Sequence, residues 1–192
     1  VEAIDLLYGR QLSVAVLAED SIAKSILSFS KTNLFEDPYV LAVPKSISLE
    51  NIRNLEELKN SPVSKALSNI IQFEFGNQHK KRIEEWFTSV LPNSRVFAKT
   101  RTYEVALSMV QSGRGVAVVP ALAARLGGKN LDFDVNLYRT NLPVRKIISL
   151  IPSQYVRVEP YKSFIEALTE TGKKMKLPKI HKVPPILESL SV

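Results

Sequence analysis

The pattern of apolar and polar positions between residues 95 and 125 changes its period as expected for strand, helix and strand. Residues 95–99 alternate apolar and polar, which predicts a strand. The next apolar residues recur at the spacing of one helix face, at Tyr103, Ala106, Leu107 and Val110. Residues 116–119 are continuously apolar, which is typical of a strand buried on both faces. Pro120 ends this strand, and Ala121 is expected to open a second helix.

Two glycines separate the first helix from the second strand. Gly113 and Gly115 are expected to end the helix and turn the chain, because glycine accepts the left-handed backbone at a helix C-terminus. A strand–helix–strand unit of this kind is a right-handed crossover that makes its two parallel strands neighbours. Ligands of open α/β sheets collect outside the carboxyl ends of such strands.

Two strand ends lie in this stretch, and both are candidate ligand sites. They comprise Thr100, Arg101, Thr102 and Val119, Pro120, Ala121. Thr102 can cap the following helix, and helix N-termini attract anions. The pattern therefore favours a small anionic ligand. The same residues fit an ordinary βαβ core unit whose loops bind nothing, and this alternative stays open.

The same periodicities predict elements along the rest of the chain. Helices are expected over residues 1–8, 49–58, 78–90 and 159–171, and strands over residues 12–17, 26–35, 39–43, 70–75, 131–137 and 144–151. Gly9 and Gly172 are expected to end the first and last of these helices. Trp86 lies on an apolar helical stripe, so it is expected in the core. Gly76, Asn77 and Gln78 form another junction at which a strand ends and a helix begins.

Alternating strands and helices indicate an α/β fold with mostly parallel sheets flanked by helices. Residues 39–43 and 144–151 bracket the central units, which suits two lobes joined by two crossover strands. We predict a first lobe of residues 1–45 plus 145–177 and a second lobe of residues 46–144, with a ligand in the cleft between them. Residues 178–192 are expected to form a C-terminal tail, either flexible or packed as a strap on another surface.

Composition narrows the class of protein. With 45% hydrophobic residues in 192, a sizeable core is possible. Cysteine is absent, which excludes disulfides and thiolate chemistry. Apolar runs are too short for a membrane span and the start lacks signal-peptide features, so a cytoplasmic location is expected. The net charge is +7, but only residues 173–182 are densely basic, so contact with DNA or another polyanion is a secondary expectation.

Motifs for catalysis, metals and cofactors are missing from the sequence. It has no GxGxxG phosphate loop and no GxSxG nucleophile elbow. His79 and His181 share no metal-ligand spacing. Glu84 and Glu85 are adjacent on a helix and point in different directions, so they do not form an acid/base pair. The sequence therefore predicts no enzyme, no metal and no cofactor.

Three segments resemble a known family. They are Leu6–Val16 (LLYGRQLSVAV), Leu34–Pro44 (LFEDPYVLAVP) and Ala106–Pro120 (ALSMVQSGRGVAVVP). Their order and spacing are similar to those of the effector-binding domain of LysR-type bacterial transcription regulators. The resemblance covers nearly the whole chain up to about Lys174. Ser13 departs from the family's usual aspartate, and Ser46–Ser48 replaces the common His-Pro-Leu.

The resemblance implies a periplasmic-binding-protein-like fold, type 2, with a small-molecule effector bound between two lobes. Carried over by position, the cleft wall includes Gly76, Asn77 and Gln78, together with Thr100, Arg101, Thr102, Val119, Pro120 and Ala121. Arg101 is the candidate for a carboxylate, since its guanidinium binds one bidentately; in the alternative it faces solvent. The resemblance also implies a dimer or tetramer and DNA binding through an N-terminal winged helix-turn-helix. That domain and the family's first strand and helix are expected upstream of Val1.

Two other functions remain open from the sequence. A solute-binding protein of a transporter shares this fold, and a signal peptide upstream of Val1 would identify one. An enzyme of the same fold is the third alternative, because Thr100-Arg101 is similar to part of the threonine-arginine-phenylalanine signature of prephenate dehydratase; Thr102 breaks that signature.

Overall fold

The computed structural model describes residues 2–22, 28–53, 61–74, 77–125 and 133–188. The chain divides into two compact units. Unit 1 contains Val1–Asp37 and Val144–Lys176, and unit 2 contains Pro38–Pro143 and Leu177–Val192. In the described part of the chain, no helix is both long and apolar enough to cross a membrane.

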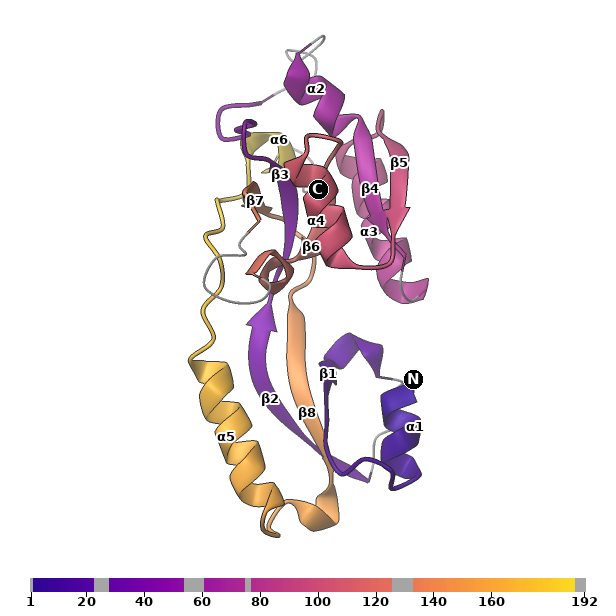
Figure 1. The fold of residues 1–192 in the computed structure, drawn as a ribbon, viewed down its shortest axis with the longest axis vertical. Helices are drawn as coiled ribbons and strands as arrows, with labels where there is room; N and C mark the ends of the chain where they lie inside the picture. Colours follow the sequence, from indigo (N-terminus) through magenta and orange to yellow (C-terminus); the bar gives the residue numbers. More distant parts are fainter. Residues whose placement is uncertain (1, 23–27, 54–60, 75–76, 126–132, 189–192) are drawn as a thin grey trace. The chain divides into compact units, whose positions relative to one another are not determined.

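Unit 1 is built on a three-stranded sheet in the order β1-β8-β2 (Figure 1). Both outer strands run antiparallel to the central one. The elements of the unit are α1 (Glu2–Tyr8), β1 (Ala15–Ala18), η1 (Glu19–Ser21), β2 (Phe29–Asp37), β8 (Arg145–Pro152), η4 (Ser153–Tyr155) and α5 (Tyr161–Lys173). A small core cluster joins α1 to the sheet and contains Leu7, Ala15, Ile148 and Leu150.

Two helix ends of unit 1 differ from the prediction. The left-handed residue that follows α1 is Arg10, with a φ of 56°, and not Gly9. α1 ends at Tyr8, directly before Gly9, and the Gly9 N–H donates to the Asp5 carbonyl at 2.8 Å. Gly172 lies inside α5 and does not end it. A Cβ at Gly172 would lie 2.5 Å from the Leu34 carbonyl oxygen, so glycine is needed there for α5 to approach β2.

A buried ion pair lies at the end of the β2–β8 ladder. Asp37 and Arg145 face each other in the register, and Asp37 Oδ2 lies 3.9 Å from Arg145 Nη1. Asp37 is only 4% exposed. The pair therefore neutralises a carboxylate in the interior of unit 1, immediately before the chain passes into unit 2.

Unit 2 contains the antiparallel strands β6-β3-β7 and the parallel pair β4-β5. A parallel bridge between Ile70 and Val116 joins the two sets. The elements are β3 (Tyr39–Pro44), α2 (Pro62–Leu67), β4 (Asn69–Phe73), α3 (Asn77–Val90), β5 (Arg95–Thr100), α4 (Tyr103–Gln111), β6 (Ala117–Pro120), η3 (Ala121–Arg125), β7 (Val135–Arg139) and α6 (Pro185–Glu188).

β5 and β6, the strands before and after α4, are not neighbours in the sheet. The prediction that they pair in parallel was therefore wrong. β4 lies between them: it pairs with β5 on one side, and Ile71 N–H donates to the Val116 carbonyl on the other at 2.8 Å. Gly115 makes this close pairing possible, because a Cβ there would lie 2.4 Å from the Asn69 carbonyl oxygen. Gly113 takes the predicted left-handed backbone, with a φ of 73°.

The prediction of mostly parallel sheets was also wrong for the described strands. Among the described strands of unit 2, the only parallel ladder is β4–β5, with single parallel bridges at Ile70–Val116 and Tyr138–His181, and both ladders of unit 1 are antiparallel. The physical reason is that β3 and β8 each run in the opposite direction through the middle of their sheet, so both neighbours of each are antiparallel to it.

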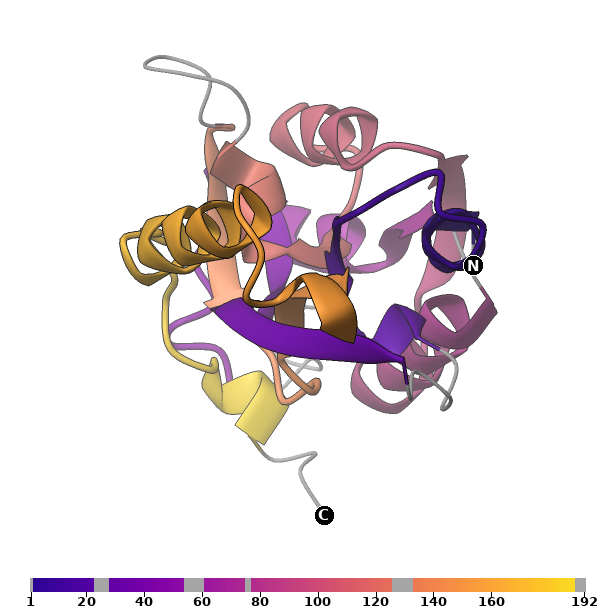
Figure 2. The same cartoon turned by 90° about the horizontal axis from the view of Figure 1, so that it is seen from below.

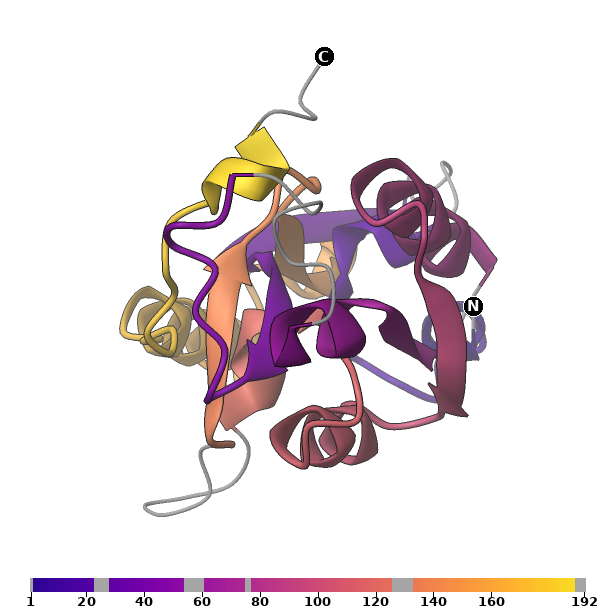
Figure 3. The same ribbon diagram turned by 90° about the horizontal axis from the view of Figure 1, so that it is seen from above.

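Helices cover both faces of the sheet in unit 2. α3 and α4 lie on opposite sides of β4 and β5, as Figures 2 and 3 show from below and above. Trp86, Phe87 and Val90 of α3 enter one buried cluster, and Leu107 and Val110 of α4 enter the other. The prediction that Trp86 belongs to the core is confirmed: it is 6% exposed, and its Nε1 donates to Asn141 Oδ1 at 2.6 Å.

The end of the described chain packs as a strap on unit 2. His181 N–H donates to the Leu137 carbonyl at 2.8 Å, and Arg139 N–H donates to the His181 carbonyl at 3.1 Å, which extends the sheet beyond β7. Ile186 and Leu187 of α6 are each 4% exposed and belong to the same cluster as Trp86. A strap on another surface was one of the two predicted forms of this segment.

The helix predicted over residues 49–58 is not seen in its described half, because residues 49–53 are turn and irregular backbone; residues 54–58 lie outside the described residues. The next described element is the short helix α2, which the sequence did not reveal. Ser61 caps it by accepting the Ser64 N–H at 3.1 Å, and Pro62 occupies its first turn.

We expect the substitution Leu187→Ala to lower the free energy of unfolding of unit 2 by about 2–4 kcal/mol, because it opens a cavity in the core. Urea denaturation followed by the fluorescence of Trp86, the single tryptophan, measures this directly. Lys182→Ala in the exposed part of the same segment is the matched control, and it should change that free energy by less than about 0.5 kcal/mol. Equal stability of the two variants would show that the segment is not part of the core.

Candidate functional site

Two parallel strands of unit 2 end at the same edge of the sheet, and each is followed by a helix (Figure 1). Phe73 and Thr100 are paired in the register, and Glu74 N–H donates to the Thr100 carbonyl at 2.7 Å. α3 begins at Asn77 and α4 at Tyr103. We call the residues 73–74 and 100–103 the strand-end edge. The positive ends of two helix dipoles therefore lie close to the ends of these two strands.

Thr100 carries a buried hydroxyl group at the strand-end edge. The residue is 7% exposed, and its Oγ1 has no hydrogen-bond partner among the residues that the structure describes. The aromatic rings of Phe73 and Tyr103 stack beside it with their centroids 4.0 Å apart. A buried hydroxyl without a partner is unfavourable in the empty protein. Thr100 thus keeps an unused hydrogen-bonding group at the strand-end edge.

Thr102 is the N-cap of α4. Its backbone is extended, and its side-chain oxygen accepts the N–H of Val105 at 3.3 Å. The prediction that Thr102 caps this helix is confirmed. The cap fixes the direction in which α4 leaves the sheet, and so it fixes the N–H groups of the first turn.

Arg101 lies between these two threonines and is exposed. Within the described part of the chain its guanidinium makes no hydrogen bond and no ion pair. It is therefore a cation that is available to an anion at the strand-end edge. Exposure alone also fits the alternative, in which Arg101 faces solvent, so its role stays a prediction.

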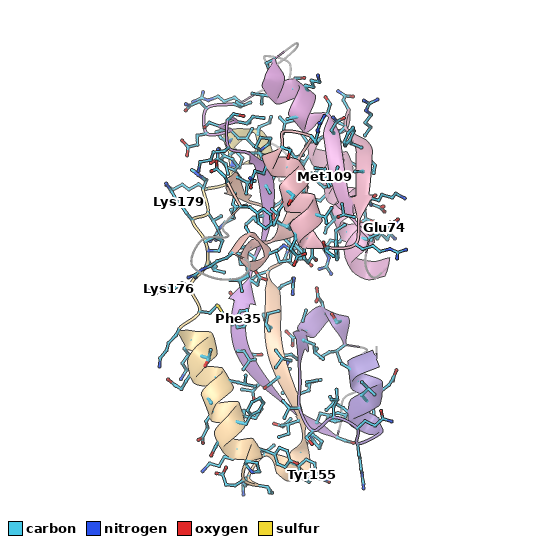
Figure 4. All side chains as sticks on the ribbon, in the orientation of Figure 1. Phe35, Glu74, Met109, Tyr155, Lys176 and Lys179 are labelled. Atoms are coloured by element: carbon cyan, nitrogen blue, oxygen red, sulfur yellow. The ribbon has the colours of Figure 1, made fainter. Side chains whose placement is uncertain are left out.

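Glu74 and Lys99 form an ion pair that sequence reasoning missed. Lys99 Nζ lies 3.2 Å from Glu74 Oε1, and Lys80 Nζ lies 3.7 Å from the same oxygen. The hydrogen bond from Lys99 holds the pKa of the Glu74 carboxyl below its ordinary value, with a smaller contribution from Lys80. Figure 4 labels Glu74 at the end of β4. The signal in the sequence was a carboxylate directly after an apolar strand, but its partners depend on the β4–β5 register.

The predicted residues after the second strand lie in the interior. Val119 and Ala121 are 0% exposed and belong to the core cluster under α4. Pro120 pairs with Tyr39, and Ala121 N–H donates to the Pro38 carbonyl at 2.9 Å. Within unit 2 these side chains pack the core, and that backbone N–H is already used.

The predicted residues at the start of α3 are only partly described. Gly76 lies outside the described residues, and Asn77 and Gln78 are placed in the first turn of α3 without any description of their side chains. The described residues contain no group of three or more histidine, aspartate or glutamate side chains that could hold a metal ion.

A cavity of about 310 Å³ in unit 2 lies away from the strand-end edge. It opens between the end of α3 and the start of β5, and Phe87, Leu91 and Val96 contribute to its apolar walls. In its polar part the Gln72 side chain donates a hydrogen bond to Glu84. Among the residues that the structure describes, none of the predicted site lines this cavity.

The sequence matches the model of one protein family, the LysR substrate binding domain, over residues 1–173. The chain belongs to that family. This LysR-type domain therefore has the periplasmic-binding-protein-like type 2 fold, as predicted. LysR substrate-binding domains are parts of transcription regulators and not enzymes, so the enzyme alternative is set aside.

Solved structures with the same fold include three regulatory domains. The reduced OxyR regulatory domain from Pseudomonas aeruginosa is 17% identical, with a TM-score of 0.57, and the match covers 91% of this chain and 78% of that one. The CcmR regulatory domain from Synechocystis PCC6803 in complex with 2-PG is 13% identical, with a TM-score of 0.61 and coverage of 91% and 80%. The effector binding domain of QuiR in complex with shikimate is 15% identical, with a TM-score of 0.57 and coverage of 92% and 79%. No curated protein matches the sequence.

We expect Thr100→Val to leave the free energy of unfolding within about 0.5 kcal/mol of the wild type, because the hydroxyl that it removes has no partner. Thr140→Val is the matched control. Thr140 is also 7% exposed, but its Oγ1 donates to the Tyr39 carbonyl at 2.8 Å and accepts the Leu142 N–H at 3.3 Å. Its replacement should cost about 1–3 kcal/mol. Urea denaturation of both variants checks this, and an equal loss in both would mean that the Thr100 hydroxyl is bonded in the folded protein.

We expect Lys99→Ala to raise the pKa of Glu74 toward its ordinary value, as measured by NMR titration of the carboxyl carbon. The pKa of the Glu74 carboxyl is lower in the folded protein than in the unfolded chain, so its ion pair stabilises the folded protein at a pH above the unfolded pKa. That stabilisation is lost as the pH falls through the folded pKa, and Lys99→Ala should remove this pH dependence. Lys81→Ala is the control, because Lys81 pairs with Glu85. An unchanged Glu74 pKa in Lys99→Ala would contradict the assignment of the pair.

Proposed function

We propose that this LysR-type domain senses a small anionic metabolite in the cleft predicted between its lobes, and that the strand-end edge of unit 2 supplies one wall. The observation that carries the proposal is the buried Thr100 hydroxyl, which has no partner among the described residues and lies next to the capped N-terminus of α4. Hydrogen-bond donors at a helix N-terminus, together with the unpaired Arg101, favour a carboxylate or phosphate over a neutral molecule.

Each predicted residue has a different role in this proposal. Thr100 offers its hydroxyl, Arg101 offers charge, and Thr102 holds the first turn of α4 in place. Gly76, Asn77 and Gln78 would present the first turn of α3 from the neighbouring strand. Val119, Pro120 and Ala121 act through packing, because their side chains lie in the interior of unit 2.

Similar proteins support the class of ligand. The CcmR domain binds 2-PG and the QuiR effector-binding domain binds shikimate, and both share this fold. We extend to this chain only the class of ligand, a small molecule with a negative charge. In a regulator, such an effector shifts the population of domain arrangements when it binds one of them more tightly. DNA binding through a further domain, a dimer or tetramer as the active form, and a cytoplasmic location are parts of the same proposal.

We expect Arg101→Ala and Thr100→Val each to weaken the binding of an anionic effector about tenfold or more without unfolding the domain. A panel of small carboxylates and phosphates that includes shikimate and 2-PG is first screened with the wild-type domain by thermal shift. Isothermal titration calorimetry then compares the variants with each anion that binds.

Arg114→Ala is the matched control for loss of charge. Arg114 is also exposed, but it follows the opposite end of α4. Its replacement should leave the affinity unchanged. If Arg101→Ala and Thr100→Val both bind every such anion with wild-type affinity, the strand-end edge is not part of the effector site.

A further inference from the structure

The cavity of unit 2 described above is not used by the proposed effector site. Its volume of about 310 Å³ lies at the lower end of the range for cavities that hold small molecules. Its lining comes from α3, from β4, from β5 and from the connection between α3 and β5. All of these residues belong to unit 2, so the cavity is complete within this unit.

The cavity is present because α3 covers β4 and leaves the start of β5 open. Ile70 and Val96 are paired in the register of β4 and β5, so their side chains point to the same face of the sheet. Ile70 is 7% exposed and packs in the cluster that contains Phe87 of α3, whereas Val96 is 48% exposed. Val96, Phe87 and Leu91 therefore offer apolar surface to a molecule that enters this space.

A buried amide forms the polar part of the cavity. Gln72 is 5% exposed, and its side-chain Nε2 donates a hydrogen bond to Glu84 Oε1. A buried amide is unfavourable unless it is hydrogen-bonded, so this bond fixes the Glu84 carboxylate beside the cavity. The hydroxyl groups of Thr88 and Ser94 donate to backbone carbonyls, so neither is directed at that carboxylate.

Glu84 is the only charged residue in the lining of the cavity. Within the described part of the chain no cation pairs with its carboxylate. Other carboxylates nearby in the sequence do have cations as partners: Glu74 pairs with Lys99, and Glu85 pairs with Lys81. Glu84 is exposed, so a ligand can reach it from solvent. The cavity thus combines apolar walls with one uncompensated negative charge.

The bond from Gln72 also selects the kind of cation. It engages Oε1 of Glu84, which leaves Oε2 as the oxygen without a partner. A guanidinium binds a carboxylate best through both oxygens at once, whereas an ammonium group is a compact charge that needs only one of them. The geometry therefore favours a protonated amine over a guanidinium.

We propose that this cavity is a binding site for a small amine with an aromatic or other compact apolar body, and that Glu84 is its charge partner. The apolar body covers the open surface of Val96, Phe87 and Leu91. The ligand has the opposite charge to the effector proposed for the strand-end edge, and the two places share no residue. Neither proposal therefore depends on the other.

The test compares three probes of similar size at pH 7: benzylamine is positive, benzyl alcohol is neutral and benzoate is negative. Binding is followed in the 192-residue domain by the side-chain amide NMR signals of Gln72 and the backbone amide signals of Ser94 and Val96. We expect saturable shifts with benzylamine and binding of benzyl alcohol that is about tenfold weaker. Benzoate should cause no shifts at these three residues.

The variant Glu84→Gln removes the charge and keeps the shape of the side chain. It should weaken benzylamine binding about tenfold, to the level of benzyl alcohol. Glu85→Gln is the matched control and should bind benzylamine like the wild type, because Glu85 is exposed, pairs with Lys81 and does not line the cavity.

A second variant separates the charge from the space. Val96→Phe fills the cavity from an exposed position of a strand, where an aromatic residue is well tolerated. It should weaken benzylamine and benzyl alcohol alike, whereas Glu84→Gln should affect only benzylamine. Melting curves of each variant, recorded by circular dichroism, show that a loss of binding is not a loss of the fold.

Four results would overturn the proposal. The first is the absence of saturable shifts with benzylamine, and the second is binding of benzyl alcohol or benzoate as tight as that of benzylamine. The third is unchanged benzylamine binding in a folded Glu84→Gln variant. The fourth is a set of signals that move with protein concentration and move no further with benzylamine, since a second copy of the chain would then fill the cavity. Retention of benzylamine binding by Arg101→Ala would confirm that the signals do not come from the strand-end edge.

Discussion

β3 is the strand on which the structure of unit 2 depends. It pairs with β6 along one edge and with β7 along the other, and residues 40–43 are 0% exposed. Its side chains alternate between the two cores: Leu41 and Val43 lie in the cluster beneath α3, and Val40 and Ala42 lie in the cluster beneath α4. A shift of one residue would exchange these sets, so the pairing of β3 fixes the places of both helices.

The local periodicities of the sequence predicted most elements but not their neighbours. Alternation and helical spacing specify the face that a residue presents, and they located β3, β5, α3 and α4 within a few residues. Strand order depends on hydrogen bonds between distant parts of the chain, and these do not produce a periodic pattern in the sequence. The insertion of β4 between β5 and β6 rests on the absence of a side chain at Gly115, and in the sequence this glycine looked only like a turn signal. Likewise, the sequence left open whether the segment that contains Ile186 and Leu187 is flexible or packed as a strap, because their burial depends on long-range contacts with unit 2.

For the candidate site too, the sequence predicted the strand ends but not which of them are exposed. The rule that ligands gather at strand ends identified Thr100 and Thr102, and the structure places them at the start of α4. The rule could not distinguish strand ends that face outward from those covered by other strands, so Val119 and Ala121 were grouped with them although both are buried. Glu74 was missed because its neutralisation by Lys99 follows from the register of two strands.

The strap has a consequence for synthesis of the protein. Unit 2 is discontinuous along the chain, and its second piece follows the whole of unit 1. During translation, residues 38–143 leave the ribosome long before Ile186 and Leu187, which complete the cluster around Trp86. Until then that cluster has an open apolar face, so domains of this kind are exposed to aggregation and to chaperones while they are still attached to the ribosome. Unit 1, whose last strand and helix come earlier, can close its sheet first.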